Sequence, residues 1–579
     1  MAKRGAGQMV RFAGRARGFT RLLVTLIYVS ALAVCHSPLE AGELTGERIG
    51  NAAAEPQNWL TFFGNYQAWS YSSLSQINRR TVKSLVPVWS FATGEKGMSA
   101  TPLVVDGVMY IAAPRNRIFA LDGATGRQLW TYEREFPEGR VARTTFGMAA
   151  GYGMIFFGTV DNHLVALDAA TGREVWDVQI EDPKQCGCGP AFAPLLVKDK
   201  IVMGVRGEVA HRSYINAFDA KTGKHAWRFW TVAGPGERGH ETWPEELWKI
   251  GGGSSWFAGS YDPELNLIYW GIGNPAPLLG STWPGKKLFT NSLVALDADT
   301  GALKWYFQEN PEDVLDLDSA TEPVLIDAPV DGVMRKLVVH PTKGGFNYVL
   351  DRATGAYIGG YPHSDTITWT KGLDKNGLPI APERLSPNED KLICPSVNGS
   401  RAANSSTYSP RTGLWVTTSY ESCALERAID PGKPVEGQLY NAGSQISTLS
   451  PTSKPHIAAF DPVTGRKAWA YETRGLNVSS LLSTGGDLIF GGDLFGNAWA
   501  LDGRSGKKVW SFNMGGGVTN KPISYAVNDR QYIAVGAGAF GAGLGLTLRL
   551  WPELKAEMPP VGSSIFVFAL PQRGKGGAP

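Results

Sequence analysis

An eleven-residue phrase that returns along the chain constrains the fold more than any other feature. The phrase consists of alanine, any residue, aspartate, any two residues, Thr-Gly or Ser-Gly, any three residues and tryptophan. Its six clear copies end at Trp130, Trp176, Trp227, Trp305, Trp469 and Trp510. Two weaker copies are anchored at Asp351 and Ser409. Most intervals between the eight anchor residues are roughly 40–60 residues, the length of one four-stranded blade.

The chemistry of the phrase indicates a hairpin end. Aspartate closes an Asx-type turn, glycine supplies a positive φ, and β-branched or aromatic residues flank the turn. Each tryptophan is then expected to pack between neighbouring sheets. The sequence therefore predicts an all-β fold, an eight-bladed β-propeller with tryptophan docking repeats.

The first 45 residues differ in composition from the rest. Six basic residues lie before or at the start of the apolar run LLVTLIYVSALAVC, and no acidic residue occurs before Glu40. This pattern is typical of an export signal, and the run is too short for a comfortable membrane span. We expect residues 1–45 to be a leader, residues 46–579 to form the propeller, and the mature protein to be periplasmic without a transmembrane domain.

Charge and cysteine content restrict the partners. The net charge of +3 is too small to indicate a nucleic-acid partner. After the leader the chain has an even number of cysteines, Cys186, Cys188, Cys394 and Cys423, which agrees with an oxidising compartment. Cys394 and Cys423 flank a loop-rich stretch and are candidates for a disulfide, whereas Cys186 and Cys188 could bridge only with strain, so that pairing stays open. No Cys-x-x-Cys-His occurs, so the chain carries no c-type haem of its own.

Four segments place polar residues in unusual glycine or proline contexts, far apart in the sequence, as expected of groups around a propeller channel. They contain Glu208 in VRGEVAH, Trp248 before three glycines, Asn274 in GIGNPAP, and Asp316 and Asp318 in VLDLDS. If LDLD is extended, its alternation puts both carboxylates on one side of the chain.

These segments resemble those of the PQQ-dependent (pyrroloquinoline quinone) alcohol dehydrogenases, the quinoprotein family that includes methanol and ethanol dehydrogenases. The resemblance runs from NYQAWSYSSLSQINRRTVKSLVPVW to SIFVFAL. It implies PQQ and a metal ion as cofactors and the oxidation of a small alcohol to an aldehyde or ketone. Because the chain lacks a haem motif, we expect the electrons to pass to a separate soluble cytochrome c.

The resemblance also implies roles for individual residues. Glu208 and Asn274 match metal ligands, Asp316 matches the general base beside the metal, and Trp248 matches the tryptophan under the flat quinone. Lys343, in HPTKGGF, falls where the family has Arg or Lys beside the reactive carbonyl, and Asn404 falls near a polar contact with the cofactor. The residue types suit these roles, because indole offers a large aromatic face, a hard cation takes oxygen ligands, and a carboxylate can accept the hydroxyl proton.

The roof of the expected cofactor pocket departs from the family. Many members have adjacent cysteines bridged above the quinone, but the matching stretch here is VARTTFGMAAGYG, with Thr144 and Thr145 about where that pair would lie. Arg143 and Thr145 are therefore expected to supply cofactor contacts instead. Leu315 also replaces the tryptophan that usually precedes the base.

Asp318 favours a lanthanide(III) ion over Ca²⁺ as the metal. Lanthanide-dependent members resemble this chain in having an aspartate two residues beyond the base. Glu208, Asp316 and Asp318 would bring three negative charges to one cation, which a trivalent ion balances better than a divalent one. Calcium remains the alternative.

Two other functions remain open from the sequence. One is a PQQ-dependent sugar or polyol dehydrogenase on the same fold, and the other is a non-catalytic propeller scaffold. The altered roof favours the scaffold, whereas Glu208, Asn274, Asp316 and Trp248 together favour an enzyme. The chain length of the alcohol and the oligomeric state, a homodimer included, also stay open.

Overall fold

The computed structural model describes residues 43–98, 100–135, 147–182, 186, 189–190, 192–206, 211–277, 285–401, 404–430, 432–433, 435, 438, 440, 444–449, 454–539 and 542–572. The chain divides into two compact units, Met1–Gly42 and Glu43–Pro579. The predicted leader therefore falls outside the described residues except for positions 43–45. Within the described ranges, no helix is both long enough and apolar enough to cross a membrane.

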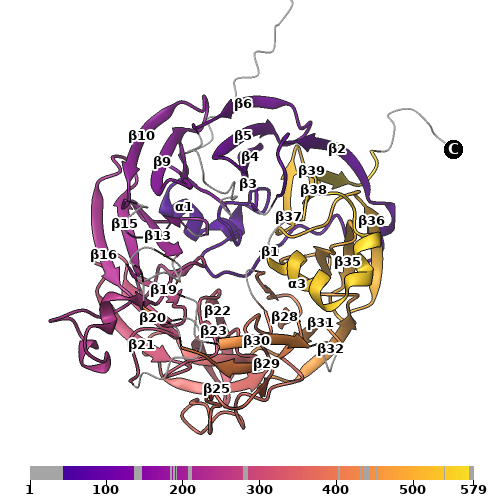
Figure 1. Cartoon of the computed structure of the whole chain (residues 1–579). Helices are drawn as coiled ribbons and strands as arrows, with labels where there is room; N and C mark the ends of the chain where they lie inside the picture. Colours follow the sequence, from indigo (N-terminus) through magenta and orange to yellow (C-terminus); the bar gives the residue numbers. More distant parts are fainter. Residues whose placement is uncertain are drawn as a thin grey trace, which may run out of the picture. The chain divides into compact units, whose positions relative to one another are not determined.

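The unit from Glu43 onward is built from twisted sheets that follow one another around a ring in chain order (Figure 1). Among the described residues, eight sheets have four or five strands. The first four contain β3 (Leu103–Val105), β4 (Val108–Ala113), β5 (Arg117–Asp122) and β6 (Gln128–Tyr132); β7 (Ala149–Gly151), β8 (Met154–Gly158), β9 (His163–Asp168) and β10 (Glu174–Gln179); β11 (Gly189–Pro190), β12 (Leu195–Val197), β13 (Lys200–Arg206), β15 (Tyr214–Asp219) and β16 (His225–Trp230); and β18 (Ser260–Asp262), β19 (Leu267–Gly271), β20 (Ser292–Asp297) and β21 (Leu303–Gln308).

The other four continue around the ring. They contain β22 (Val324–Val330), β23 (Val333–Pro341), β24 (Phe346–Asp351) and β25 (Tyr357–Pro362); β27 (Thr407–Ser409), β28 (Leu414–Ser419), β31 (His456–Phe460) and β32 (Lys467–Glu472); β1 (Tyr71–Ser72), β33 (Leu482–Thr484), β34 (Leu488–Gly492), β35 (Asn497–Asp502) and β36 (Lys508–Asn513); and β37 (Ile523–Val527), β38 (Arg530–Ala537), β39 (Ser564–Ala569) and β2 (Val86–Ala92). Smaller elements are the pair β14 (His211–Arg212) and β17 (Gly251–Gly252), the sheet β26 (Lys391–Ile393), β29 (Cys423–Ala428) and β30 (Ser444–Leu449), and the helices α1 (Gly46–Gly50), α3 (Ala542–Leu550), η1 (Ala52–Ala54), η2 (Val82–Ser84), η3 (His240–Thr242), η4 (Leu247–Lys249) and η5 (Pro552–Glu557).

The sequence of each strand reflects its depth in the sheet. In β5, RIFALD, the four central residues are buried, because both faces of the strand pack against neighbouring sheets. In β6, QLWTY, only Trp130 is fully buried. Tryptophan is therefore the residue through which an outer strand reaches the core.

The repeat tryptophans join successive sheets, as the sequence predicts. Trp130 donates its indole N–H to the carbonyl oxygen of Ala169 at 3.0 Å, and a Cβ on Gly172 would come within 2.6 Å of its ring. Only glycine fits there, because Gly172 also has a φ of +73°. The same two contacts join Trp176 to Ala220 and Gly223, Trp227 to Ala298 and Gly301, Trp305 to Arg352 and Gly355, and Trp469 to Gly503 and Gly506.

One copy of the repeat differs from the others in its position within the sheet. Seven anchor residues lie between the two outer strands of a sheet, whereas Ser409 lies at the hairpin between β27 and β28, the inner pair. The sheet without an outer hairpin is the one assembled from both ends of the chain. There β2 pairs with β39, from Val86 opposite Ala569 to Ala92 opposite Ser564.

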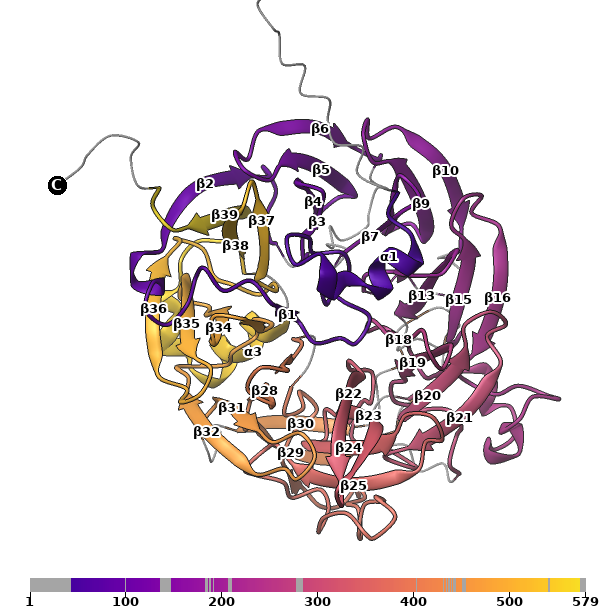
Figure 2. The ribbon, with the colours of Figure 1, turned by 180° about the vertical axis from the view of Figure 1, so that it is seen from behind.

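Residues 44–72, which we call the crossing segment, run across the middle of the ring (Figure 2). The segment hydrogen-bonds to each of the eight larger sheets. Its partners are Val104, Tyr152, Leu196, Tyr261, Leu325, Tyr408, Ser483 and Ala526. Leu44 is already packed in the core, while the domain boundary at residue 45 stays a prediction.

Candidate active site

Asp316 and Asp318 lie in the loop between β21 and β22 and are only 6% and 3% exposed. Lys343, in the turn between β23 and β24, holds both carboxylates. Its Nζ is 2.8 Å from Asp316 Oδ2 and 3.4 Å from Asp318 Oδ2. Asp316 has a φ of +59°, so LDLD is not the extended chain considered above. The turn and the shared ammonium, rather than strand alternation, bring the two carboxylates together.

Asn274 adjoins this pair. Its backbone N–H donates to Asp318 Oδ1 at 3.0 Å. Gly273 permits the approach, because a Cβ there would lie 2.4 Å from the same oxygen. The side-chain nitrogen of Asn274 donates to the carbonyl of Pro275, but its Oδ1 is buried and has no hydrogen-bond partner in the part of the chain that the structure describes. A buried amide oxygen beside two carboxylates fits a hard cation such as a lanthanide or calcium ion.

Trp248 lies in η4 and is tied to the Asn274 segment by the glycine run that follows it. Gly251, Gly252 and Gly253 all have positive φ, and the N–H of Gly253 donates to the carbonyl of Asn274 at 2.8 Å. Trp248 is half-buried, with the Arg212 guanidinium 5.3 Å from its ring centroid. The glycines therefore connect the proposed quinone floor to the proposed metal ligand.

Asn404 is buried and already has protein partners. Its Nδ2 donates to Thr418 Oγ1, and the Tyr420 hydroxyl donates to its Oδ1 at 2.8 Å. Cofactor contact by this amide stays a prediction.

Three other predicted site residues, Glu208, Arg143 and Thr145, lie outside the described residues. In the part of the chain that is described, no three His, Cys, Asp or Glu side chains come together in a way that could hold a metal ion. Of the four predicted metal ligands, Asn274, Asp316 and Asp318 are among the described residues.

Sequence reasoning missed Asp313, which is buried three residues before Asp316. Its carboxylate accepts the N–H groups of Leu315 and Leu317 at 3.0 and 2.9 Å. Burial raises the pKa of Asp313, and these backbone donors oppose the rise. The Asp-x-x-Asp spacing in EDVLD is the one signal that pointed to it.

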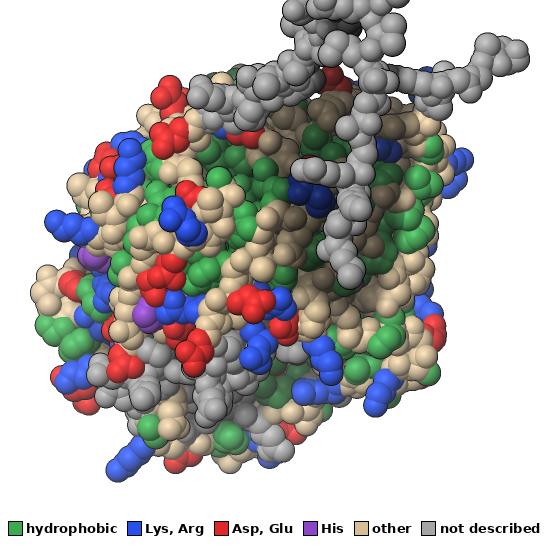
Figure 3. All heavy atoms as spheres, turned by 90° about the horizontal axis from the view of Figure 1, so that it is seen from above, with side chains coloured by type: hydrophobic (Ala, Val, Ile, Leu, Met, Phe, Trp, Pro, Cys, Tyr) green, Lys and Arg blue, Asp and Glu red, His purple; other side chains and the backbone are tan. Residues whose placement is uncertain are grey.

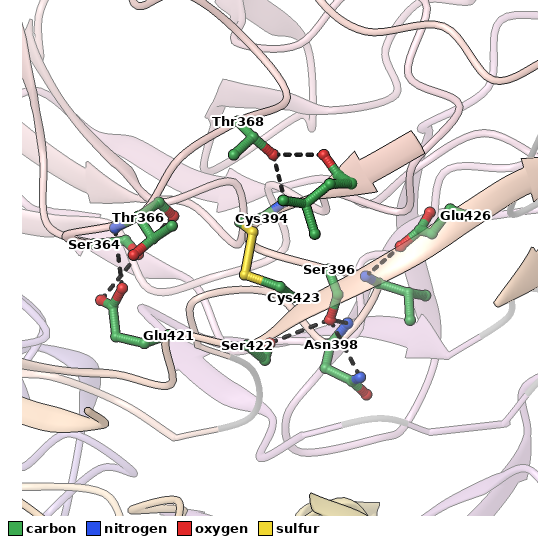
Figure 4. The surroundings of a disulfide bond; sticks show 12 residues. Ser364, Thr366, Thr368, Cys394, Ser396, Asn398, Glu421, Ser422, Cys423 and Glu426 are labelled. Atoms are coloured by element: carbon green, nitrogen blue, oxygen red, sulfur yellow. Dashed lines mark hydrogen bonds between the residues drawn. A yellow bond between two sulfur atoms is a disulfide. The ribbon is translucent and has the colours of Figure 1, made fainter. Parts of the chain in front are cut away.

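The predicted disulfide between Cys394 and Cys423 is confirmed (Figure 4). It ties the loop after β26 to β29. Nearby, the N–H of Val397 donates to Glu426 Oε1 at 3.2 Å. The same loop continues to Ser400, whose N–H donates to the carbonyl of Lys343 at 2.9 Å. The bridge therefore braces the loop that supports Lys343.

The second cysteine pair is only partly described. Cys186 is buried, and Cys188 lies outside the described residues.

The sheets follow one another in a ring, as in a β-propeller, and the loops between them carry a buried group of carboxylate, amide and ammonium side chains. Residues 59–361 match the family model "Glucose/ethanol/alcohol dehydrogenase, beta-propeller domain", and residues 408–540 match the model "Outer membrane protein assembly factor BamB".

Relatives match along most of the chain. Quinoprotein alcohol dehydrogenase PedH of Pseudomonas putida is 34% identical, over 92% of this chain and 94% of its own. A quinohemoprotein alcohol dehydrogenase of Comamonas testosteroni is also 34% identical, over 87% of this chain and 76% of its own. The solved structure of a europium-containing methanol dehydrogenase has a TM-score of 0.85 at 30% identity, covering 90% of this chain and 100% of that one.

The chain belongs to the PQQ-dependent (quinoprotein) alcohol dehydrogenase family. It is accordingly a PQQ-dependent alcohol dehydrogenase with PQQ and a lanthanide or calcium ion as cofactors.

Proposed function

We propose that the protein oxidises a small alcohol to an aldehyde or ketone in the periplasm, with Asp316 as general base, and passes the electrons to a separate soluble cytochrome c. The observation that carries the proposal is the buried group of Asp316, Asp318, Lys343 and Asn274. When bound, PQQ supplies the two-electron redox chemistry.

The residues of this group have distinct tasks. Asp316 accepts the proton of the alcohol hydroxyl as the alcohol is oxidised. The ammonium of Lys343, 2.8 Å from Asp316 Oδ2, keeps that carboxylate oriented. The half-buried indole of Trp248 offers a flat face to a flat cofactor.

Asn274 Oδ1, Asp316 and Asp318, together with Glu208, would hold the metal ion. Asp318 is buried and its Oδ1 accepts the N–H of Asn274, so its carboxylate faces the site and not the solvent. Lys343 offsets part of the negative charge, but PQQ brings three carboxyl groups of its own. The assembled site is therefore rich in negative charge, which favours a trivalent lanthanide, as in the europium-containing methanol dehydrogenase.

The location and the electron acceptor rest on the sequence. The basic and apolar pattern of residues 1–45 supports export. The absence of Cys-x-x-Cys-His supports a separate cytochrome. Acidic and basic side chains are interspersed on the face drawn in Figure 3, so nothing there suggests a nucleic-acid surface.

The Asp316→Asn variant should test the proposed base. The amide has the shape of the carboxylate but cannot accept the proton, so kcat should fall at least about 100-fold while PQQ stays bound. Dye reduction would be measured with ethanol, longer alcohols, polyols and sugars, beside a PQQ titration. A near-normal kcat would remove Asp316 from this role, and turnover of sugars or polyols alone would favour the sugar or polyol dehydrogenase.

The metal assignment is tested with apo-protein loaded with PQQ and either La³⁺ or Ca²⁺. We expect activity with lanthanum to exceed that with calcium in the parent, and Asp318→Ala to lose the lanthanum activity selectively. Full calcium activity in the parent, unchanged by Asp318→Ala, would contradict the lanthanide assignment and leave the dehydrogenase intact.

A further inference from the structure

The loop that carries Asp316 is organised around the carboxylate of Asp313. Asp313 Oδ1 accepts the N–H of Leu315 at 3.0 Å, and Oδ2 accepts the N–H of Leu317 at 2.9 Å. These two N–H groups belong to the residues on either side of Asp316. Asn310 adds a third hydrogen bond, from its Nδ2 to Asp313 Oδ1 at 3.0 Å. The backbone is therefore held immediately before and immediately after the proposed base.

Asp316 needs such support because of its own conformation. Its φ of +59° lies in the left-handed region, which is unfavourable for a residue with a Cβ. A strained backbone persists only where surrounding contacts determine it. Without them, the loop would relax and the carboxylate of Asp316 would move relative to the substrate.

Burial raises the pKa of Asp313, while the N–H groups that donate to its carboxylate oppose the rise. Asp313 is only 3% exposed, and its donors are backbone and amide N–H groups. Lys287 is buried too, and its Nζ has no hydrogen-bond partner among the described residues. Burial lowers the pKa of its ammonium to about 8, while the charges of Asp313 and Glu312 oppose that fall. A buried ammonium beside a buried carboxylate reduces the cost of keeping both charged.

We propose that Asp313 is a positioning residue, which holds the backbone on both sides of Asp316 and so places the base for proton abstraction. The proposal rests on the proposed function of Asp316. Asp313 itself contacts neither of the proposed metal-ligand carboxylates in any hydrogen bond or ion pair of the described residues.

The chain contains a matched control. Asp493, in the loop between β34 and β35, accepts the N–H groups of Phe495 and Asn497 at 3.0 and 2.9 Å. The spacing is the same as for Asp313, two and four residues ahead. That loop carries none of the residues proposed for the site. Both N–H groups bond to Oδ1 of Asp493, and Asn497 Nδ2 donates to both oxygens, whereas Asp313 uses one oxygen for each backbone N–H. Asp493→Asn makes the same change from carboxylate to amide, away from the base.

The test compares Asp313→Asn and Asp493→Asn with the parent, each as full chain loaded with PQQ and metal. In Asp313→Asn, the side-chain NH₂ group takes the place of one carboxylate oxygen and faces one of the two backbone N–H donors. That backbone hydrogen bond is therefore lost. We expect Asp313→Asn to lower kcat roughly 10- to 100-fold, as misplacement of a catalytic group does, with KM and the PQQ titration within about twofold of the parent. Asp493→Asn should leave kcat within about twofold.

Hydrogen exchange supplies a readout that does not depend on turnover. The amides of residues 315 and 317 should exchange at least about tenfold faster in Asp313→Asn and at the parent rate in Asp493→Asn. If Asp313→Asn does not fold, Asn310→Ala removes only the third donor and should lower kcat roughly two- to fivefold at unchanged KM.

Unchanged exchange and unchanged kcat in the Asp313 variant would overturn the proposal. Equal loss of kcat in both aspartate variants would also overturn it, because the effect would then be general destabilisation. A different result would contradict the proposed function of Asp316. In that case Asp316→Asn would remain active, while the exchange result would still report whether Asp313 holds the loop.

Discussion

The ionisation of Glu426 conflicts with its location. Glu426 is 0% exposed in β29, and its Oε2 is buried with no hydrogen-bond partner among the described residues. Burial raises its pKa to about 7, and the negative charge of Asp313 adds to the effect, while the N–H of Val397 and the charge of Lys343 oppose it. A folded protein above neutral pH therefore contains a poorly compensated carboxylate.

We therefore expect Glu426→Gln to stabilise the folded protein, by an amount that depends on pH. Because the folded pKa is above the unfolded value of 4.5, the carboxyl favours folding most below pH 4.5, and the stability is lost as the pH rises to about 7. The shift corresponds to a free energy on the order of 3 kcal/mol at about 1.4 kcal/mol per pKa unit. Glu426→Gln should raise the thermal midpoint above that of the parent at pH 8, and the difference should shrink toward pH 5. Parallel curves across this range would contradict it.

From the sequence, residues that lie together at the candidate site could be predicted better than the residues that support them. Asn274, Asp316, Asp318 and Lys343 stand in short, distinctive phrases, and the structure brings them together. The buried state of Glu426 could not be predicted, because it depends on packing against distant parts of the chain rather than on its neighbours in sequence.

At the level of elements, the same contact between a repeat tryptophan and a glycine connects successive sheets. The packing of the tryptophan between sheets was predicted from the repeat, whereas its contact with the glycine of the next copy was not. The repeat also could not tell that Ser409 belongs to an inner hairpin, since the same turn chemistry closes inner and outer hairpins alike. The sheet of β26, β29 and β30 carries no repeat marker, so nothing in the sequence indicated it.

Because of this contact between tryptophan and glycine, we expect Gly301→Ala to lower the stability of the protein. A Cβ at Gly301 would lie 2.5 Å from the Trp227 ring, and the φ of +71° is unfavourable as well. Overpacking and backbone strain together should lower the free energy of unfolding by about 2–4 kcal/mol. Gly413→Ala is the control, because φ is +68° but nothing lies within 4 Å, so only about 1 kcal/mol should be lost. Denaturation midpoints would be compared, and equal losses would show that ring contact adds nothing.

At the scale of the whole molecule, the ring closes where β2 meets β39. A chain that stops after Ser563 lacks β39, which leaves β2 and β38 with unpaired edges and exposes the inter-sheet core. We expect this variant to be insoluble or to lose its cooperative thermal transition. A chain that stops after Gln572 keeps the whole of β39 and should melt like the parent. Equal melting of both would show that closure is dispensable.

The crossing segment has a consequence for how the protein is made. Residues 44–72 are translated early, but their partners are spread over all eight sheets, the last being Ala526. At about 5–20 residues per second, the roughly 450 intervening residues take on the order of 20–90 s to synthesise. During that time the stretch WLTFFGNYQAWSYS, which is rich in aromatic side chains, can bind only the sheets already made, beginning with that of Val104. Its remaining apolar surface stays exposed until the later sheets form, which makes it a site where a chaperone would prevent aggregation.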